Sequence, residues 1–166
     1  TNCTDIPPVD SLQRDCVMPK EVTIGSQVWT ATNLDVSTYR NGDSIPQVQS
    51  QYYWGNLTTG AWCYYENKTA NGTTYGKLYN WLAVNDPRSI APVGYHVPTI
   101  GEWKILSDYL GGDSIAGGKM KEVGTTYWNS PNIDASNTSL FTALPSGVIS
   151  ATGVFRFLGS ETSWWS

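Results

Sequence analysis

Side chains suited to acid–base or nucleophilic chemistry are scarce in this sequence. His96 is its only histidine, which excludes a metal site built from several histidines. A Cys63–His96 pair would form an activated nucleophile only if the fold joined them, and nothing in the sequence does so. The common nucleotide-binding and hydrolase motifs are absent. We therefore predict no catalytic residue, no cofactor and no enzyme, with a structural role for His96.

Calcium is a separate question, because it takes roughly six to eight oxygen ligands from clustered acidic, amide and backbone groups. The sequence shows no such cluster. Each isolated oxygen donor lies in a turn sequence that already explains it. These donors are Asn41, Asp43, Asp113, Asp134 and Asn137. We predict no metal site, and calcium binding stays open without support.

Aromatic side chains are the most suggestive binding feature. Positions 52–54 and 62–65 carry consecutive rings, and alternate side chains of an extended segment point to opposite faces. A flat ring beside amides suits the apolar face of a sugar, and it equally suits a protein hot spot. We predict Tyr52, Trp62 and Tyr64 as ligand contacts. The tryptophans expected in the core are Trp54, Trp81, Trp103, Trp128 and Trp164.

Length and charge narrow the class of protein. A chain of 166 residues has the size of one domain. Only 14% of residues are charged, the net charge is −4, and no run of Lys or Arg offers a footprint for nucleic acid. No apolar run approaches the roughly 20 residues that cross a bilayer. We expect neither nucleic-acid binding nor membrane insertion.

The first 20 residues are predicted to form an irregular leader or linker, and residues 21–166 the folded domain. Cys3 and Cys16 bracket a Pro-containing segment that could close as a disulfide, which favours an oxidising compartment. Two unpaired thiols are the alternative. Cys63 is the odd cysteine.

Several local patterns predict the elements that would position these side chains. Alternation around Gly25-Ser26 predicts a hairpin over 21–29 with Val22, Ile24 and Val28 inward. Turns are expected at 41–43 and 71–72, which carry Asn-Gly pairs. Short late strands are expected at 141–144, 148–149 and 154–158.

Two main helices are predicted. Apolar residues at helical spacing indicate a helix over about 75–85. Thr99 and Glu102 form a capping box that begins a helix over 99–110, and Gly111-Gly112 ends it. A weaker helical turn follows through Lys121. The buried stripe of the capped helix is expected to be Trp103, Leu106, Tyr109 and Leu110. Strands, two central helices and more strands describe an α+β domain with long loops.

A series of motifs in a fixed order adds a family resemblance. These motifs are VTIGSQVW (22–29), NL (33–34), YRNGD (39–43), GKLYNW (76–81), PVGYHVPT (92–99), EW (102–103), GGKMKE (117–122) and FTALP (141–145). Together they resemble the Fibrobacter succinogenes major paralogous domain over residues 22–166. The resemblance implies a C-type-lectin-like fold, related to the formylglycine-generating enzyme, with short twisted antiparallel strands. It also implies an exported protein of Bacteroidota or Fibrobacterota at the cell surface.

The resemblance has further implications. Relatives usually continue past a Trp-Trp-Ser element into a strand that commonly pairs with the first, so the 22–29 region is expected to lack its partner. Ala91 stands where many relatives carry Cys, which leaves Cys63 without a disulfide partner. No cysteine follows Cys63, so formylglycine-generating activity is expected to be absent. Three Asp-Ser-Leu/Ile tripeptides resemble the Bacteroidota O-glycosylation pattern, and their serines are Ser11, Ser44 and Ser114.

The functional prediction is a non-catalytic, extracellular recognition or adhesion domain of a bacterial surface protein. It would bind a glycan or a surface protein through loop aromatics and amides. The alternative is an assembly module of a surface filament or complex, which associates through the edge of its N-terminal strand and is completed by a neighbour's strand. A degenerate enzyme-like domain is a third interpretation.

Overall fold

The computed structural model describes residues 20–166. The Cys3–Cys16 pair, Ser11 and nearly all of the expected leader lie outside the described residues. In chain order the elements are β1 (Glu21–Ile24), β2 (Gln27–Thr30), α1 (Gln51–Trp54), β3 (Trp62–Cys63), η2 (Tyr65–Asn67), α2 (Thr69–Tyr75), β4 (Leu78–Tyr79), α3 (Trp81–Val84), α4 (Ile100–Tyr109), α5 (Asp113–Met120), β5 (Val148–Ile149) and β6 (Phe155–Arg156). Each pair β1–β2, β3–β4 and β5–β6 forms a two-stranded antiparallel sheet. The α+β class is confirmed.

The N-terminal hairpin forms as predicted, but one of its residues faces the other way. Gly25 has a φ of +62°, which suits the tight turn between β1 and β2. Directly opposite residues share a face of the sheet, and Trp29 is opposite Val22 while Val28 is opposite Thr23. Trp29 is therefore buried, whereas Val28 is 53% exposed. The expected inward position of Val28 was wrong.

Helix α4 begins at its predicted capping box. The Thr99 hydroxyl accepts a hydrogen bond from the Glu102 N–H, and the Glu102 carboxylate accepts one from the Thr99 N–H. Leu106 and Leu110 are buried as expected. Tyr109 is instead exposed, with its ring over Gly25 at the hairpin turn. The expected burial of Tyr109 was wrong.

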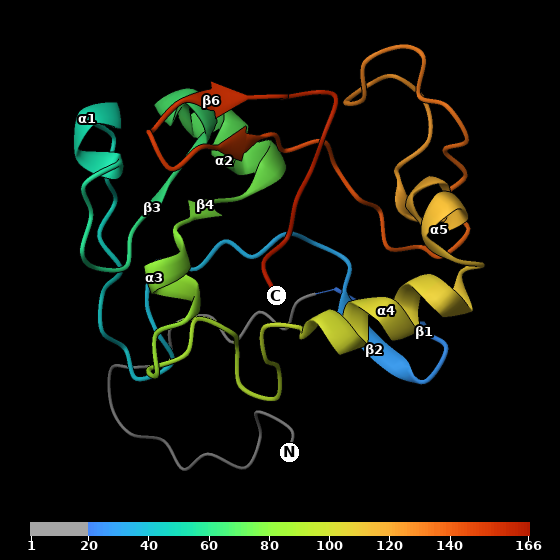
Figure 1. The fold of residues 1–166 in the computed structure, drawn as a ribbon, viewed down its shortest axis with the longest axis horizontal. Coiled ribbons are helices and arrows are strands. Elements are labelled where there is room, and N and C mark those ends of the chain that lie inside the picture. The colour runs from blue at the N-terminus through green and yellow to red at the C-terminus, as the bar shows by residue number, and fades with distance from the viewer. Residues whose placement is uncertain (1–19) are drawn as a thin grey trace.

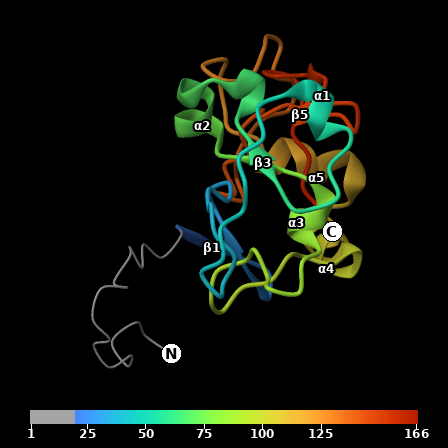
Figure 2. The same ribbon diagram turned by 90° about the vertical axis from the view of Figure 1, so that its left-hand side faces the viewer.

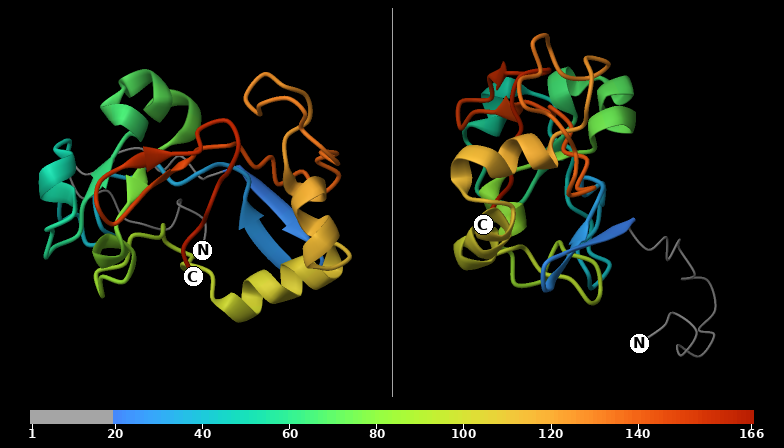
Figure 3. Two further views of the ribbon diagram at one scale, coloured as in Figure 1. Left: turned by 45° about the horizontal axis from the view of Figure 1, so that its top comes forward. Right: turned by 90° about the vertical axis from the view of Figure 1, so that its right-hand side faces the viewer.

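A core cluster joins the hairpin to α4 and α5, and Figure 3 shows these two helices beside the hairpin. Gly111 and Gly112, with φ of +107° and +94°, redirect the chain from α4 into α5. The buried members of the cluster are Ile24, Trp29, Leu106, Leu110, Ala116, Met120, Phe141 and Ala143. This cluster fixes the position of β2 against the rest of the domain.

The helix predicted over 75–85 does not exist as one element. Helix α2 ends at Gly76, whose φ of +76° breaks the helical path. Strand β4 follows and pairs with β3, and Asn80 then caps the short helix α3 by accepting the Ala83 N–H. The turn expected at 71–72 was also wrong, because both residues lie inside α2. The Asn-Gly turn at 41–43 is confirmed by the bond from the Gly42 N–H to the Tyr39 carbonyl.

The later chain closes the structure with few regular elements. The strand expected at 141–144 is reduced to a single bridge between Lys121 and Ala143, whereas β5 and β6 form. Figures 1 and 2 place α1, α2 and the β5–β6 pair toward one end of the molecule, and the hairpin with α4 toward the other. The C-terminal segment ends between these two ends (Figure 1) and toward one face of the molecule (Figure 2).

Candidate ligand-binding cleft

A cleft of about 1320 Å³ lies at the centre of the domain. Its walls include the whole of β2, the loop that carries Tyr95 and His96, and the C-terminal pair Trp164 and Trp165. Sites for small ligands typically measure roughly 300–1,000 Å³, so this cleft has room for a larger ligand or a chain segment. The segments that line it are distant in sequence and are brought together only by the fold.

Aromatic rings make one wall of the cleft. The ring of Trp164 lies 5.5 Å from that of Trp103 and 5.4 Å from that of Phe141. Trp165 lies 5.6 Å from Trp81, and its indole Nε1 donates to the Tyr79 carbonyl at 3.0 Å. Trp164 remains 38% exposed, and the expectation that it lies in the core was wrong. The wall therefore offers apolar surface to a ligand.

Trp81 was also expected in the core, but it is exposed on α3. Trp54 and Trp128 are buried as expected, and Trp103 is partly buried against the core cluster. The tryptophans thus divide between the core, the cleft wall and, for Trp81, the surface of α3 outside the cleft.

Several of the ionisable groups that border the cleft are already engaged. His96 Nε2 lies 2.8 Å from the Glu102 carboxylate, and Tyr95 donates to Glu21. The Thr99 N–H, followed by His96, lowers the pKa of Glu102. Burial, followed by the bond to Glu21, raises the pKa of Tyr95 to about 12. None of these shifts prepares a general base near neutral pH.

Cys63 and His96 do not meet. Cys63 is fully buried in a cluster with Trp54 and Ala61, whereas His96 is exposed at the cleft. Burial raises the pKa of the Cys63 thiol to about 12, so the residue is unsuited to nucleophilic chemistry. Cys63 is a free thiol. In residues 20–166, no three His, Cys, Asp or Glu side chains gather to hold a metal ion.

The three predicted contact residues are placed apart from the cleft. Tyr52 is 77% exposed on α1 and does not line it. Trp62 is only 8% exposed, and its Nε1 donates to the Ile45 carbonyl at 2.8 Å. Tyr64 is half-buried, 5.1 Å from the Trp62 ring, and it covers Gly72. Trp62 therefore lacks the exposure that a contact role requires, and the three residues form no common patch.

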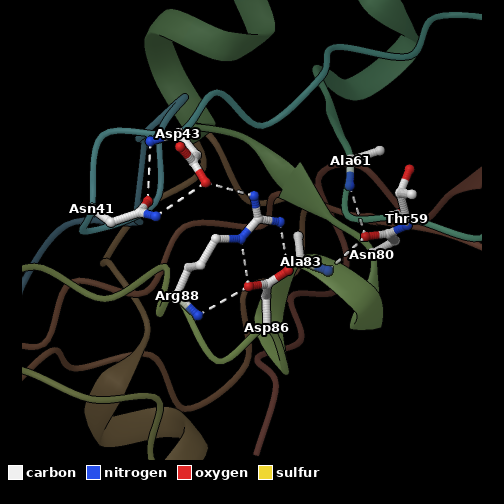
Figure 4. Close-up of polar contacts among 8 residues, drawn as sticks. All are labelled: Asn41, Asp43, Thr59, Ala61, Asn80, Ala83, Asp86 and Arg88. Carbon is white, nitrogen blue, oxygen red and sulfur yellow. Dashed lines mark hydrogen bonds and ion pairs between the residues drawn. The ribbon is translucent and has the colours of Figure 1, made fainter.

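A second polar cluster, shown in Figure 4, is a structural network. Arg88 bonds to both Asp86 and Asp43, and Asn41 also bonds to Asp43. The Arg88 guanidinium lies 4.0 Å from the centre of the Tyr39 ring. Because Arg88 already occupies both carboxylates, Asn41 and Asp43 are not free calcium ligands.

The other candidate serines are at the surface. Ser44 and Ser114 are both exposed, Ser44 beside the polar cluster and Ser114 in the first turn of α5. Both remain candidate O-glycosylation sites.

The fold and the cleft define a class: a small α+β domain with a central cleft that has one aromatic wall. None of the helices in residues 20–166 is long and apolar enough to span a bilayer. The sequence model of the Fibrobacter succinogenes major domain family matches residues 22–166, and the chain belongs to this family. The family prediction is thereby confirmed. Neither a curated protein nor a solved structure matches the chain.

Sequence reasoning missed the cleft residues. The sequence predicts a core position for Trp164 and no role for Trp165, and it indicates the 22–29 region only as an edge for strand pairing and not as the wall of a cleft. The only sequence signals were the adjacent tryptophans near residue 166 and a hairpin strand without charged residues.

Proposed function

We propose that this protein is a non-catalytic recognition domain of an exported bacterial surface protein, and that it binds its partner in the central cleft. The partner is a glycan or a protein, and the scaffold is a variant of the C-type-lectin-like fold. The observation that carries the proposal is the aromatic cleft of about 1320 Å³ beside β2. Exposed indole rings in a cleft are the usual anchors of recognition sites.

The electrostatics support a binding role over a catalytic one. Two of the acidic groups at the cleft are occupied, Glu102 by capping and Glu21 by a hydrogen bond. Lys77 is held by Asp35 at 2.6 Å, so its charge is also neutralised. A cleft without a free nucleophile or a poised base supports recognition by contact and not by reaction.

The test is a screen of the isolated chain against glycan and peptide arrays, with and without calcium. Binding should quench or shift the fluorescence of the cleft tryptophans. It should be lost in Trp164→Ala and kept in Tyr52→Ala, a matched exposed aromatic outside the cleft. Circular dichroism of both variants checks that the fold persists.

Two results would count against the proposal. Binding lost in Tyr52→Ala but kept in Trp164→Ala would move the contact site to α1. The absence of any ligand on either array would remove the support for a recognition role.

A further inference from the structure

We infer that the ligand of the cleft is an extended polypeptide segment of a partner protein, which pairs as a strand with the outer edge of β2. The inference rests on the proposed function, because it names the partner class of the same cleft. It places strand pairing on β2, and not along the first strand of the chain.

The backbone of β2 offers a row of unpaired groups to the cleft. In an antiparallel hairpin with a two-residue turn, hydrogen-bonded residue pairs alternate with non-bonded pairs, and the first bonded pair here is Ile24 with Gln27. The bond from the Ala31 N–H to the Lys20 carbonyl, 2.6 Å long, confirms this alternation. The N–H and C=O groups of Val28 and Thr30 therefore point away from β1. Within residues 20–166 they have no backbone partner.

The outer edge of β2 lies at the cleft. Val28 and Thr30 both line the cleft, whereas on the free edge of β1 Glu21 lines it and Thr23 does not. The two outward residues are separated by roughly 6.6–6.8 Å along the strand, the repeat of a polypeptide partner. An unpaired strand edge is a template for another extended chain.

Two buried side-chain atoms of β2 are also unpaired. Trp29 Nε1 and Gln27 Oε1 are buried, and neither has a hydrogen-bond partner. Both residues belong to β2 and line the cleft, and Trp29 is only 8% exposed. Buried polar groups are normally paired, so β2 has unsatisfied polar groups in its side chains as well as along its outer edge.

The charges and rings of the cleft define the segment further. Lys77 is neutralised by Asp35, whereas the Glu21 and Glu122 carboxylates at the cleft have no cationic partner among the described residues, so a strongly acidic ligand is not favoured. The Trp164 ring is tilted by 31° against Trp103, with its centre 5.5 Å away, which leaves fewer ring faces for a sugar. We expect a neutral segment with apolar side chains at alternate positions.

The experiment uses a phage-displayed library of random 12-residue peptides, selected on the whole chain, and the tightest peptide is then synthesised. Amide hydrogen exchange is measured by NMR with and without this peptide. Exchange at Val28 and Thr30 should slow at least tenfold. The amide of Thr23, on the opposite edge of the same hairpin and outside the cleft, is the matched control and should not change.

A second measurement tests the peptide itself. N-methylation at one alternate set of its residues should weaken binding at least tenfold, whereas methylation at the intervening residues should not. This difference is expected only when one edge of the peptide backbone is bonded to a strand.

Three results would overturn the inference. One is protection of Val28 and Thr30 in the ligand-free protein, which would mean that its own chain covers the edge. Another is a library without binders, or a peptide that protects neither amide. The third is a glycan whose binding is lost in Trp164→Ala and which protects neither amide. That result would overturn the peptide inference but would still support the proposed recognition function. If no ligand of any class binds the cleft, both proposals fail.

Discussion

Two adjacent glycines in α5 should respond in opposite ways to the same substitution. A Cβ added at Gly117 would meet nothing within 4 Å. A Cβ added at Gly118 would lie 2.5 Å from the carbonyl oxygen of Asp134, which is a backbone atom. The loop there is also held by the bond from the Ser136 N–H to the Gly118 carbonyl, 2.8 Å long. Gly118 is thus required by close packing, whereas Gly117 is not.

The magnitude follows from a cancellation. Replacing glycine by alanine inside a helix raises the free energy of unfolding by about 0.5–1 kcal/mol, and both positions are helical. Gly117→Ala should show this gain alone. Gly118→Ala carries the same gain together with an overpacking cost of about 1–3 kcal/mol. The helix term cancels between the two variants, so Gly118→Ala should be about 1–3 kcal/mol less stable than Gly117→Ala.

The assay is urea or thermal unfolding followed by circular dichroism. For a chain of this size, 1 kcal/mol corresponds to roughly 2–4 °C in Tm, so the two variants should differ by roughly 2–12 °C. Equal stability of Gly117→Ala and Gly118→Ala would refute the packing of the Asp134 loop on α5. A loss of stability in Gly117→Ala would refute the open surface there.

Three further predictions concern the polar and buried groups. Arg88 lowers the pKa of Asp86 to about 2, so the ion pair contributes to the free energy of unfolding above the unfolded pKa near 4, and this contribution is lost as the pH falls toward 2. In Arg88→Gln, the free energy of unfolding, measured in urea melts at pH 5 and 2.5, should therefore fall less between the two pH values than it does in the unsubstituted protein. An equal fall in both proteins would contradict the network. Cys63, with a thiol pKa of about 12, should resist a thiol reagent at pH 8 until the protein unfolds, and mass spectrometry would show early labelling if its burial is wrong. Trp62→Phe leaves the buried Ile45 carbonyl without its donor and should lower the free energy of unfolding by about 1–3 kcal/mol, measured by urea titration; a neutral effect would argue against that bond.

The elements that sequence predicted well are those decided by local chemistry. The Thr99–Glu102 capping box needs only residues within one turn, and the glycines after α4 adopt the left-handed conformations that end it. The helix predicted over 75–85 does not form because contacts distant in sequence determine the structure of this segment. Leu78 and Tyr79 pair with Cys63 and Trp62, and that long-range pairing outweighed the helical spacing of apolar side chains.

The burial of Trp62, which was predicted to contact a ligand, has a related cause. Alternation along an extended segment places neighbouring side chains on opposite faces, but it does not say which faces are covered. On β3 both are covered, because Trp62 belongs to one buried cluster and Cys63 to another. A strand buried on both faces exposes no ring.

The composition of β2 adds a further argument for a functional edge. Exposed edge strands are usually protected from pairing by charged residues, proline or bulges. The four residues of β2, Gln27–Thr30, include no charge and no proline, and their outward backbone groups face the cleft. In β1, by contrast, Glu21 places a charge at the start of the strand. An edge without protection beside an aromatic wall is a liability in isolation, and a strand partner that covers it would remove that liability.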